Sequence, residues 1–322
     1  MTEERYAADR RLIAILALLV AVVSVLYIVV GLKSSTWRYA LSLRVPRLLA
    51  MIVTGAAAAY STVTFQTLTN NRILTPAIMG LDSLYVLLQS LAVYLFGAGS
   101  VVVSDPRLNF LVVIAGMLAF AVVLYNFLYR REERGLAFLL LVGIILGTFF
   151  QSGASFIQMV VDPNEFSVLQ NRMLASFNNM NTGILWLAGI LLVGAMIVIA
   201  RQLTTLDVLA LGREHAINLG VPYDRVVRRL MVVVAVLVSV STGLVGPLMF
   251  LGLLVANLAR ERLHTYLHRY LLAAAALISI LALVGGQFLA ERVFNFAAPI
   301  SVLINLAGGL YFILLLLKES RA

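Results

Sequence analysis

Apolar stretches long enough to cross a lipid bilayer recur along the whole chain of 322 residues. A hydrocarbon core about 30 Å thick is crossed by about 20 apolar residues in an α-helix. Because the backbone must satisfy its own hydrogen bonds in lipid, we expect each stretch to be helical. The predicted spans are Leu12–Leu32, Arg47–Thr67, Gly80–Ala98, Leu108–Tyr129, Leu136–Gln158, Ile184–Arg201, Leu230–Val245, Leu248–Leu258, Tyr270–Leu289 and Pro299–Leu317. These segments, of which the eighth is short, predict an all-α integral membrane protein of about ten transmembrane helices, with residues 1–322 forming a single transmembrane domain.

Composition excludes most other classes. The chain is 62% hydrophobic and 12% charged, whereas soluble domains are about 45–50% apolar and about 25% charged. The net charge of +9 is the usual result of basic loops on one side of a membrane protein, so we expect no nucleic-acid partner. Without cysteine there is no disulfide framework or thiolate metal site. The charged residues 1–11 precede a long apolar run without a cleavage site, which predicts an uncleaved first span.

The basic residues predict the orientation of the chain. With an even number of spans, both ends of the chain lie on one side of the membrane. The loops and ends on that side carry 17 of the 24 Lys and Arg residues, and the other side carries 7. Basic residues concentrate in cytoplasmic loops. We therefore predict that both termini are cytoplasmic.

A basic segment of mixed polarity, residues 204–225, interrupts the apolar pattern on the predicted cytoplasmic side. Gly220 and Pro222 punctuate helices for opposite steric reasons, so we expect two short helices separated near Gly220-Val221-Pro222. Arg228 and Arg229 follow directly. The pattern favours a structured loop that binds a soluble partner, and the alternative is an ordinary solvated loop.

The chain carries no recognisable means of using ATP. A phosphate-binding loop needs a lysine within a glycine-rich turn, and the two lysines, Lys33 and Lys318, each follow a leucine. No catalytic set of side chains is recognisable either, so we expect a non-catalytic chain powered by another subunit. The alternative is a secondary transporter driven by an ion gradient, for which Asp82 is the one candidate acid. Its position after Pro76 and Gly80 is also that of a helix cap.

Two further patterns concern packing and metal binding. Small residues at 55–59 favour close approach of helix backbones. Polar side chains follow in the same span, and we expect them to line a wet path or a helix interface: Ser61, Thr62, Thr64 and Gln66. Three residues have a spacing that could place metal ligands on one helix face, although a solvated basic loop is the favoured interpretation: Glu261, His264 and His268.

Four segments, taken in order, resemble the FecCD-like permeases, the membrane subunits of binding-protein-dependent ABC importers for ferric siderophores, haem and cobalamin. They are Leu43–Leu48 followed by Gly55, Gln66, Asn71, Pro76 and Gly80; Leu211–Ala216 with Leu219–Val221; Gly246-Pro247 with Phe250–Leu253; and the last span ending in Leu317-Lys318. The resemblance covers nearly the whole chain. It implies a ten-helix permease of the bacterial cytoplasmic membrane, paired with a second permease around a central path.

The resemblance implies that Leu211–Val221, within the cytoplasmic coupling segment of residues 204–225, docks on a cytoplasmic ATPase. That partner would hold ATP and Mg, and this chain would hold no cofactor and no metal. The implied coupling residues are Leu211, Gly212, Arg213, Glu214, Ala216, Leu219, Gly220 and Val221. A short helix pair joined to two spans can transmit closure of the ATPase as a rigid-body tilt. In the loop 69–75, the implied cytoplasmic gate residues are Asn71 and Ile73.

On the outer side, the resemblance implies that Arg44, Arg47 and Arg292 meet acidic residues of a substrate-binding protein. Such charge pairs mainly set orientation and on-rate. The alternative is that these arginines snorkel or contact lipid phosphate. We also expect a short external helix within residues 162–181. Its polar residues contact solute or cap the helix: Ser176, Asn178 and Asn179.

The chain departs from the family pattern at three places. Ala256-Asn257 stands where a Pro-His pair is usual, Arg213 where an acid is common, and Arg72 where proline is common. This combination resembles the subgroup that serves ferric catecholate siderophores and pairs with a second, non-identical permease. We therefore predict an importer subunit that passes ferric siderophore inward by alternating access, in a heterodimer rather than a homodimer. A membrane scaffold without a transport role explains the polar second span and the segment 204–225 poorly.

Overall fold

The computed structural model is a helical bundle, with no strand among the residues it describes, which are 2–32, 37–129, 136–173, 175–178, 180–294 and 299–319. In chain order the helices are α1 (Thr2–Val29), α2 (Trp37–Leu68), η1 (Pro76–Met79), α3 (Leu81–Phe96), α4 (Val101–Ser104), α5 (Pro106–Tyr129), α6 (Leu136–Val160), α7 (Pro163–Met173), η2 (Thr182–Ile184), α8 (Leu185–Ala200), α9 (Leu203–Leu209), α10 (Arg213–Asn218), α11 (Tyr223–Val245), α12 (Leu251–Arg262), α13 (His268–Arg292) and α14 (Ile300–Glu319). Two of these, η1 and η2, are 3-10 turns.

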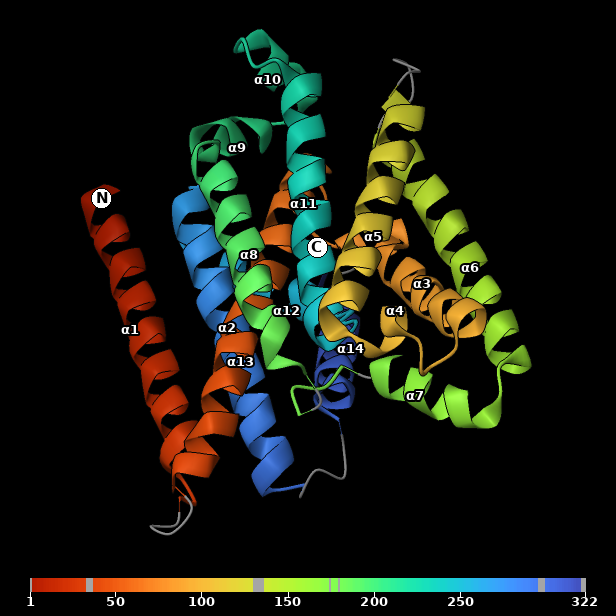
Figure 1. Ribbon diagram of the computed structural model, residues 1–322. Helices are drawn as coiled ribbons and strands as arrows, with labels where there is room; N and C mark the ends of the chain where they lie inside the picture. The colour runs from red at the N-terminus through yellow and green to blue at the C-terminus, as the bar shows by residue number, and fades with distance from the viewer. Residues whose placement is uncertain are drawn as a thin grey trace.

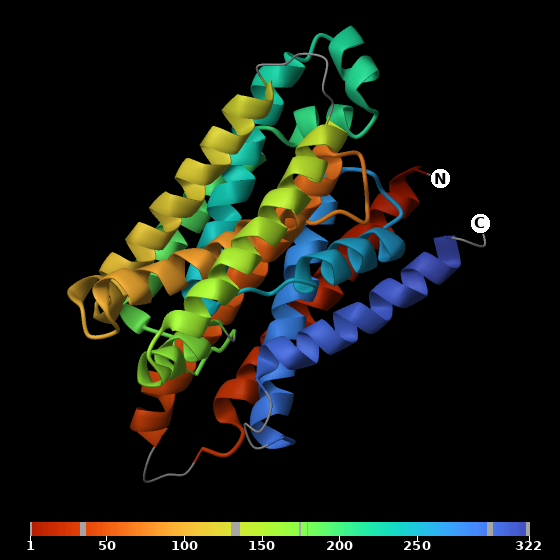
Figure 2. The same cartoon turned by 90° about the vertical axis from the view of Figure 1, so that its right-hand side faces the viewer.

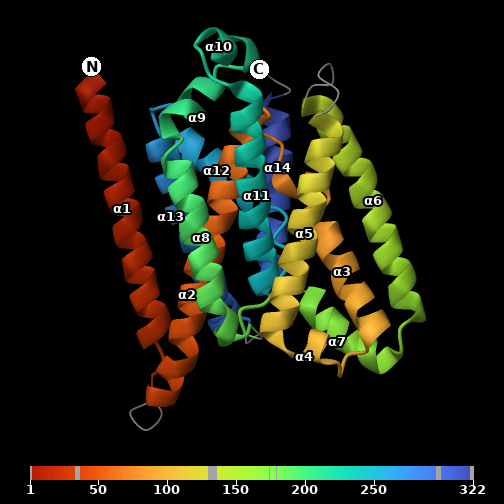
Figure 3. The same ribbon diagram turned by 45° about the horizontal axis from the view of Figure 1, so that its top comes forward.

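The long helices run between two ends of the bundle (Figure 1). The start of α1 and the short helices α9 and α10 lie at one end, which we call the α10 end. The end of α1 and helix α7 lie at the other, which we call the α7 end. Helix α14 finishes toward the α10 end, so the first and last helices place both chain ends toward the same side (Figures 2 and 3).

Each of the ten predicted spans falls on one helix of the structure, although the ends of the helices differ from the predicted ones. Among the described residues, seven helical segments are long and apolar enough to cross a membrane, and two shorter apolar helices lie at Leu81–Phe96 and Ile300–Leu314. The eighth predicted span is α12, which has 12 residues and therefore a length of about 18 Å. The predicted all-α membrane fold is confirmed, and α7 is the short helix expected within residues 162–181, whose external location stays a prediction.

Two of the predicted spans are preceded by non-α-helical backbone inside the bundle, and we call these two stretches the interrupted segments. The turn η1 precedes α3, and an irregular stretch from Gly246 to Phe250 precedes α12. Backbone that is not helical is tolerated at membrane depth only where protein or a wet cavity surrounds it. Both interruptions meet this condition, because Thr75, Pro76 and Leu248 are buried.

Helix α2 lies at the centre of the bundle, packed against α11, α13 and α12, whereas α1 is largely exposed and packs mainly on α13. A Cβ atom added to Gly55 in α2 would lie 3.1 Å from the backbone nitrogen of Ile280 in α13. This contact confirms the close packing predicted from the small residues at 55–59.

A second close approach joins α6 to η1. A Cβ on Gly143 would lie 2.9 Å from the Cα of Met79, and a Cβ on Gly80 would lie 2.8 Å from the Cα of Gly147. The signal for this contact is the spacing of two glycines four residues apart in α6, which sequence analysis missed. The α6 glycines therefore hold the interrupted segment before α3 in place.

Candidate functional site

The segment 204–225, which we call the coupling segment, lies at the α10 end and contains α10 and nearly all of α9 (Figure 1). The break between the two helices lies at Gly212, where φ is 99° and ψ is 166°. This backbone region is essentially restricted to glycine. The break predicted near Gly220 is therefore wrong, since Gly220-Val221-Pro222 instead separates α10 from α11.

Gly220 ends α10 in a Schellman motif. Its φ of 83° lies in the left-handed region that favours glycine. The Gly220 N–H donates to the Ile217 carbonyl at 2.9 Å, and the Val221 N–H donates to the Ala216 carbonyl at 3.0 Å. These are the two hydrogen bonds of the motif. Backbone bonds and glycine geometry thus fix α10 at both of its ends.

Large apolar side chains of the coupling segment are exposed. Leu211 is 58% exposed, Leu219 63% and Ile217 47%, whereas Ala216 is fully buried and anchors α10. Helix α10 and its flanking turns, which carry these residues, project at the α10 end (Figure 3). Exposed apolar side chains of this kind are what a surface for a protein partner would present.

The charged residues of α10 differ in what they contact. The guanidinium of Arg213 lies over the ring of Tyr223, 5.7 Å from its centroid, which is a cation–π distance. Glu214 is exposed on the first turn of α10. The predicted coupling residues are thus brought together on one projection, and their role in docking stays a prediction.

Asp207 of α9 connects the coupling segment to the bundle through His268. One Asp207 carboxylate oxygen accepts the backbone N–H of His268 at 2.7 Å and lies 2.7 Å from its Nδ1 atom. The other ring nitrogen of His268 lies 2.7 Å from the hydroxyl of Thr67 near the end of α2. Because His268 and Thr67 are buried, this chain of contacts joins α9, α13 and α2 into one unit.

The predicted gate loop, residues 69–75, follows α2 directly. Its backbone is held at Arg72, whose carbonyl accepts hydrogen bonds from Gln66 at 2.6 Å and from Asn257 at 3.2 Å. The Asn71 side chain accepts the N–H of Ile73 at 2.9 Å and closes a local turn. Two departures from the family pattern, Arg72 and Asn257, are therefore in contact. The gate role of Asn71 and Ile73 stays a prediction.

Arg260 places a positive charge next to this loop. Its guanidinium donates to the side-chain carbonyl of Gln66, which in turn donates to the Arg72 carbonyl. The contact of Arg260 with Gln66 could not be predicted from the sequence, since helical spacing along α12 does not indicate contact with α2.

At the α7 end, Arg44 and Arg292 both bind the end of α1. The Arg44 guanidinium donates to the carbonyls of Ile28 at 2.6 Å and Val30 at 2.9 Å. Arg292 donates to the same Val30 carbonyl. Cations are favoured there because the last carbonyls of a helix lack partners and carry partial negative charge. These arginines therefore cap α1, and docking of a binding protein stays a prediction for them.

Arg47 is paired inside the chain. Its guanidinium lies 3.8 Å from the carboxylate of Glu291. The same carboxylate accepts the hydroxyl of Tyr27 at 3.0 Å and the amide of Gln287 at 2.8 Å. The predicted docking arginines thus lie at one end of the bundle, as expected, but each already has an intramolecular partner.

Two of the three predicted external polar residues lie near α7. Ser176 lines a cavity of about 460 Å³ at the α7 end, together with Tyr85, Asn109 and Asn181. The Asn178 side chain accepts from Gln287 at 3.2 Å, so it is tied to α13. Asn179 lies outside the described residues.

Asp82 is not the cap of α3. Gly80 occupies the cap position, and Asp82 lies in the first turn of the helix. Its carboxylate accepts the hydroxyl of Thr242 in α11 at 3.1 Å and is buried. Of the polar residues predicted on α2, Ser61 and Thr62 line a cavity beside Asp82, and Thr64 and Gln66 are buried between helices.

The possible metal ligands near residue 264 do not share a helix. Helix α12 ends at Arg262 and α13 begins at His268. His264 lies 3.6 Å from Asp9, whereas His268 pairs with Asp207. Within the part of the chain that the structure describes, no group of three such ligands is brought together.

The family model that describes the FecCD transport family matches residues 11–318. The chain belongs to the FecCD transport family. It is 54% identical to the petrobactin import system permease protein YclO of Bacillus subtilis (strain 168), over 89% of this chain and 91% of that protein. It is 35% identical to the petrobactin import system permease protein FatC of Bacillus anthracis, over 86% of this chain and 78% of that protein.

The fold is also found in a solved structure. A metal-chelate type ABC transporter in an inward-facing conformation matches with a TM-score of 0.85 and 22% identity, covering 96% of this chain and 99% of that one. The family predicted from the sequence is thereby confirmed, and the two petrobactin relatives support the predicted siderophore subgroup.

Proposed function

We propose that this FecCD family member is the membrane permease of an ABC importer that brings a ferric siderophore of the petrobactin class across the bacterial cytoplasmic membrane. The support for this cargo is the 54% identity to a petrobactin import permease. The chain itself would be a non-catalytic subunit that alternates between outward-open and inward-open states.

The observation that carries the proposal is the construction of the coupling segment. Leu211, Ile217 and Leu219 are exposed on a projection whose backbone is fixed by Gly212 and Gly220. A separate ATPase, which holds ATP and Mg, would cover these side chains. In this arrangement the α10 end faces the cytoplasm, and so do both termini. The excess of basic residues predicted for that side agrees with this orientation.

The contacts from α9 to the gate loop would transmit the movement of the ATPase to the gate. Asp207 binds His268, and His268 contacts Thr67, which lies directly before the loop 69–75. A tilt of α9 driven by ATPase closure would therefore move the end of α2 together with the start of α13. Because packed helices shift as rigid bodies, this movement would open or close the path at Asn71 and Ile73.

The α7 end would receive the external substrate-binding protein, with Arg292 exposed and Arg44 and Arg47 partly exposed. The path itself would lie between this chain and a second permease. We propose a non-identical partner, in keeping with the subgroup resemblance. Mass spectrometry of the complex purified from its native membrane distinguishes the two cases, since a homodimer would yield this chain as its one permease.

The decisive experiment is uptake of ferric petrobactin into proteoliposomes that contain the complex and its binding protein. We expect uptake with ATP at the α10 side, and none with a non-hydrolysable ATP analogue. Uptake should persist after ionophores collapse the proton and sodium gradients. Uptake that needs a gradient and not ATP would contradict the proposal and support a secondary transporter.

A further inference from the structure

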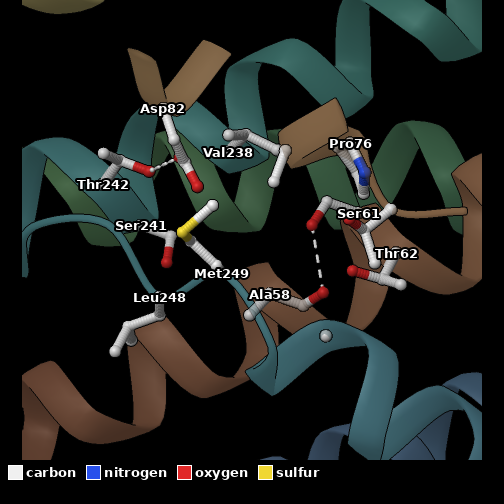
Figure 4. A pocket seen from close by; sticks show the side chains of 13 residues that line it. Ala58, Ser61, Thr62, Pro76, Asp82, Val238, Ser241, Thr242, Leu248 and Met249 are labelled. Atoms are coloured by element: carbon white, nitrogen blue, oxygen red, sulfur yellow. Dashed lines mark hydrogen bonds between the residues drawn. The ribbon is translucent and has the colours of Figure 1, made fainter. Parts of the chain in front are cut away.

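A small polar cavity of about 40 Å³ lies inside the bundle, between α2, α3, α11 and the two interrupted segments. It is lined by Asp82, Thr242 and Ser241 on one side and by Ser61 and Thr62 of α2 on the other (Figure 4). A water molecule needs about 10–15 Å³ of such volume. The cavity is therefore large enough for a small ion with a water molecule.

If Asp82 is ionised, its charge needs a positive counterpart within this cavity. Its side chain is 8% exposed, and the cavity lining includes no lysine, arginine or histidine among the described residues. An ionised carboxylate inside a membrane protein is costly unless a positive charge neutralises it. The one hydrogen bond from Thr242 is neutral and supplies no such charge.

The remaining lining groups offer oxygen atoms. The hydroxyls of Thr62 and Ser241 belong to side chains that are 3% and 6% exposed, and neither makes a hydrogen bond within the described residues. Thr75, beside η1, lines the same cavity. Interrupted membrane helices place carbonyl and hydroxyl oxygens where small cations bind. Met249 lies across the cavity and is 53% exposed, so displacement of its flexible side chain gives a route of entry.

We propose that this cavity binds one monovalent cation, with sodium as the probe, through the Asp82 carboxylate and the hydroxyls of Thr62, Ser241 and Thr242. A single carboxylate neutralises one positive charge, and a divalent ion would leave a net charge buried in the membrane. The ion would join the start of α3 to α2 and α11, and so hold the two interrupted segments together. This site is independent of the ATP-driven cycle proposed above.

The experiment measures the thermal unfolding midpoint of the purified complex in lipid nanodiscs. Sodium chloride is varied against choline chloride at constant ionic strength. We expect a saturable rise of the midpoint with sodium, because a ligand that binds only the folded state stabilises it. Equilibrium binding of radioactive sodium should saturate at one ion for each copy of this chain. Neither measurement uses ATP or siderophore, so its failure leaves the importer proposal intact.

The matched variants are Asp82→Asn, which removes the charge at constant size, and Asp105→Asn, an exposed acid before α5. Asp82→Asn should abolish the response to sodium, and Asp105→Asn should keep it. Ser241→Ala and Thr62→Val should weaken sodium binding by about tenfold each, the loss expected when one ligand to a charged group is removed. These two keep the test decisive if Asp82→Asn fails to fold.

Two results would overturn the site. One is a wild-type midpoint that is the same in sodium and choline and changes only with pH, which would assign a proton to Asp82. The other is a sodium response that survives in Asp82→Asn, or in both hydroxyl variants, since the ion would then bind elsewhere.

Discussion

The two ends of the bundle hold their surface side chains in opposite ways. At the α10 end, backbone hydrogen bonds and two glycines fix the coupling segment, and Leu211 and Leu219 stay exposed. At the α7 end, side chains hold the backbone in place, since Arg44 and Arg292 bind the last carbonyls of α1. Side chains of the first kind are available to a partner at no cost to the fold. Those of the second kind hold the end of α1, and under the proposed function they would also contact the binding protein.

This difference predicts separable effects of mutation. Changes to side chains at the α10 end should alter partner function and leave stability nearly constant. Changes to the arginines at the α7 end should alter both quantities together. Backbone changes at the α10 end should be the most severe, because the position of every exposed side chain depends on two glycines.

Gly212→Val should have the largest effect. The φ of 99° and ψ of 166° at this residue exclude a β-branched side chain, with strain of about 1–3 kcal/mol. Relief of that strain would turn α10 away from the ATPase. We expect uptake to fall by more than about tenfold, the factor that corresponds to about 1.4 kcal/mol, while membrane insertion is unchanged. Uptake assays with quantification of inserted protein measure both.

Gly194→Val in α8 is the matched control, since a Cβ there meets open space and the backbone is helical. It should transport at the wild-type rate. Glu214→Ala tests the exposed side chain with the backbone intact, and should reduce uptake without changing the unfolding midpoint. Normal uptake by both Gly212→Val and Glu214→Ala would remove the coupling role.

His268→Gln tests whether the coupling segment moves with the bundle. The substitution removes the paired contacts of the buried ring with Asp207 and Thr67. We expect a loss of about 1.5–3 kcal/mol in the free energy of unfolding, the range for hydrogen bonds to a charged group. ATP hydrolysis should continue while uptake per ATP falls, because α9 would tilt without α2. Parallel assays of phosphate release and uptake measure this ratio.

His264→Gln is the control for that experiment. His264 has a side chain that is 68% exposed and lies 3.6 Å from Asp9, so its loss should leave both quantities near wild type. If His268→Gln lowered stability and kept the ratio of uptake to ATP, the link from α9 to α2 would be structural alone.

The sequence predicted the helical bundle well, because apolar length is a property of single segments, whereas the roles of the residues at its two ends stay predictions. It misplaced the break in the coupling segment. Gly220 and Pro222 together are a strong local signal, whereas Gly212 has no proline beside it and gives a weaker one. The sequence also suggested a helix cap for Asp82. Its actual contact with Thr242 could not be predicted, because the two residues lie far apart in the chain.

The partners of the arginines could not be predicted for a related reason. Arg44 and Arg292 bind backbone carbonyls of α1, and every residue has a carbonyl, so no pattern of side chains reveals them. The contact between Asn257 and residue 72 is of the same kind, because Asn257 donates to the backbone carbonyl of Arg72 and not to its side chain.

Arg44→Gln should have the smallest effect, and it sharpens the comparison between the ends most. The variant loses hydrogen bonds to the end of α1, which should lower the free energy of unfolding by about 1 kcal/mol. Loss of the charge should also slow association with the binding protein, since exposed charges act mainly on the on-rate. Stopped-flow binding at two salt concentrations separates that effect from the change in stability. Arg38→Gln, whose guanidinium lies 5.4 Å from the centroid of the Trp37 ring at the same end, is the control. If Arg44→Gln lowers stability and leaves the on-rate equal to that of Arg38→Gln, the arginine serves α1 alone, and the α7 end recognises its partner by other groups.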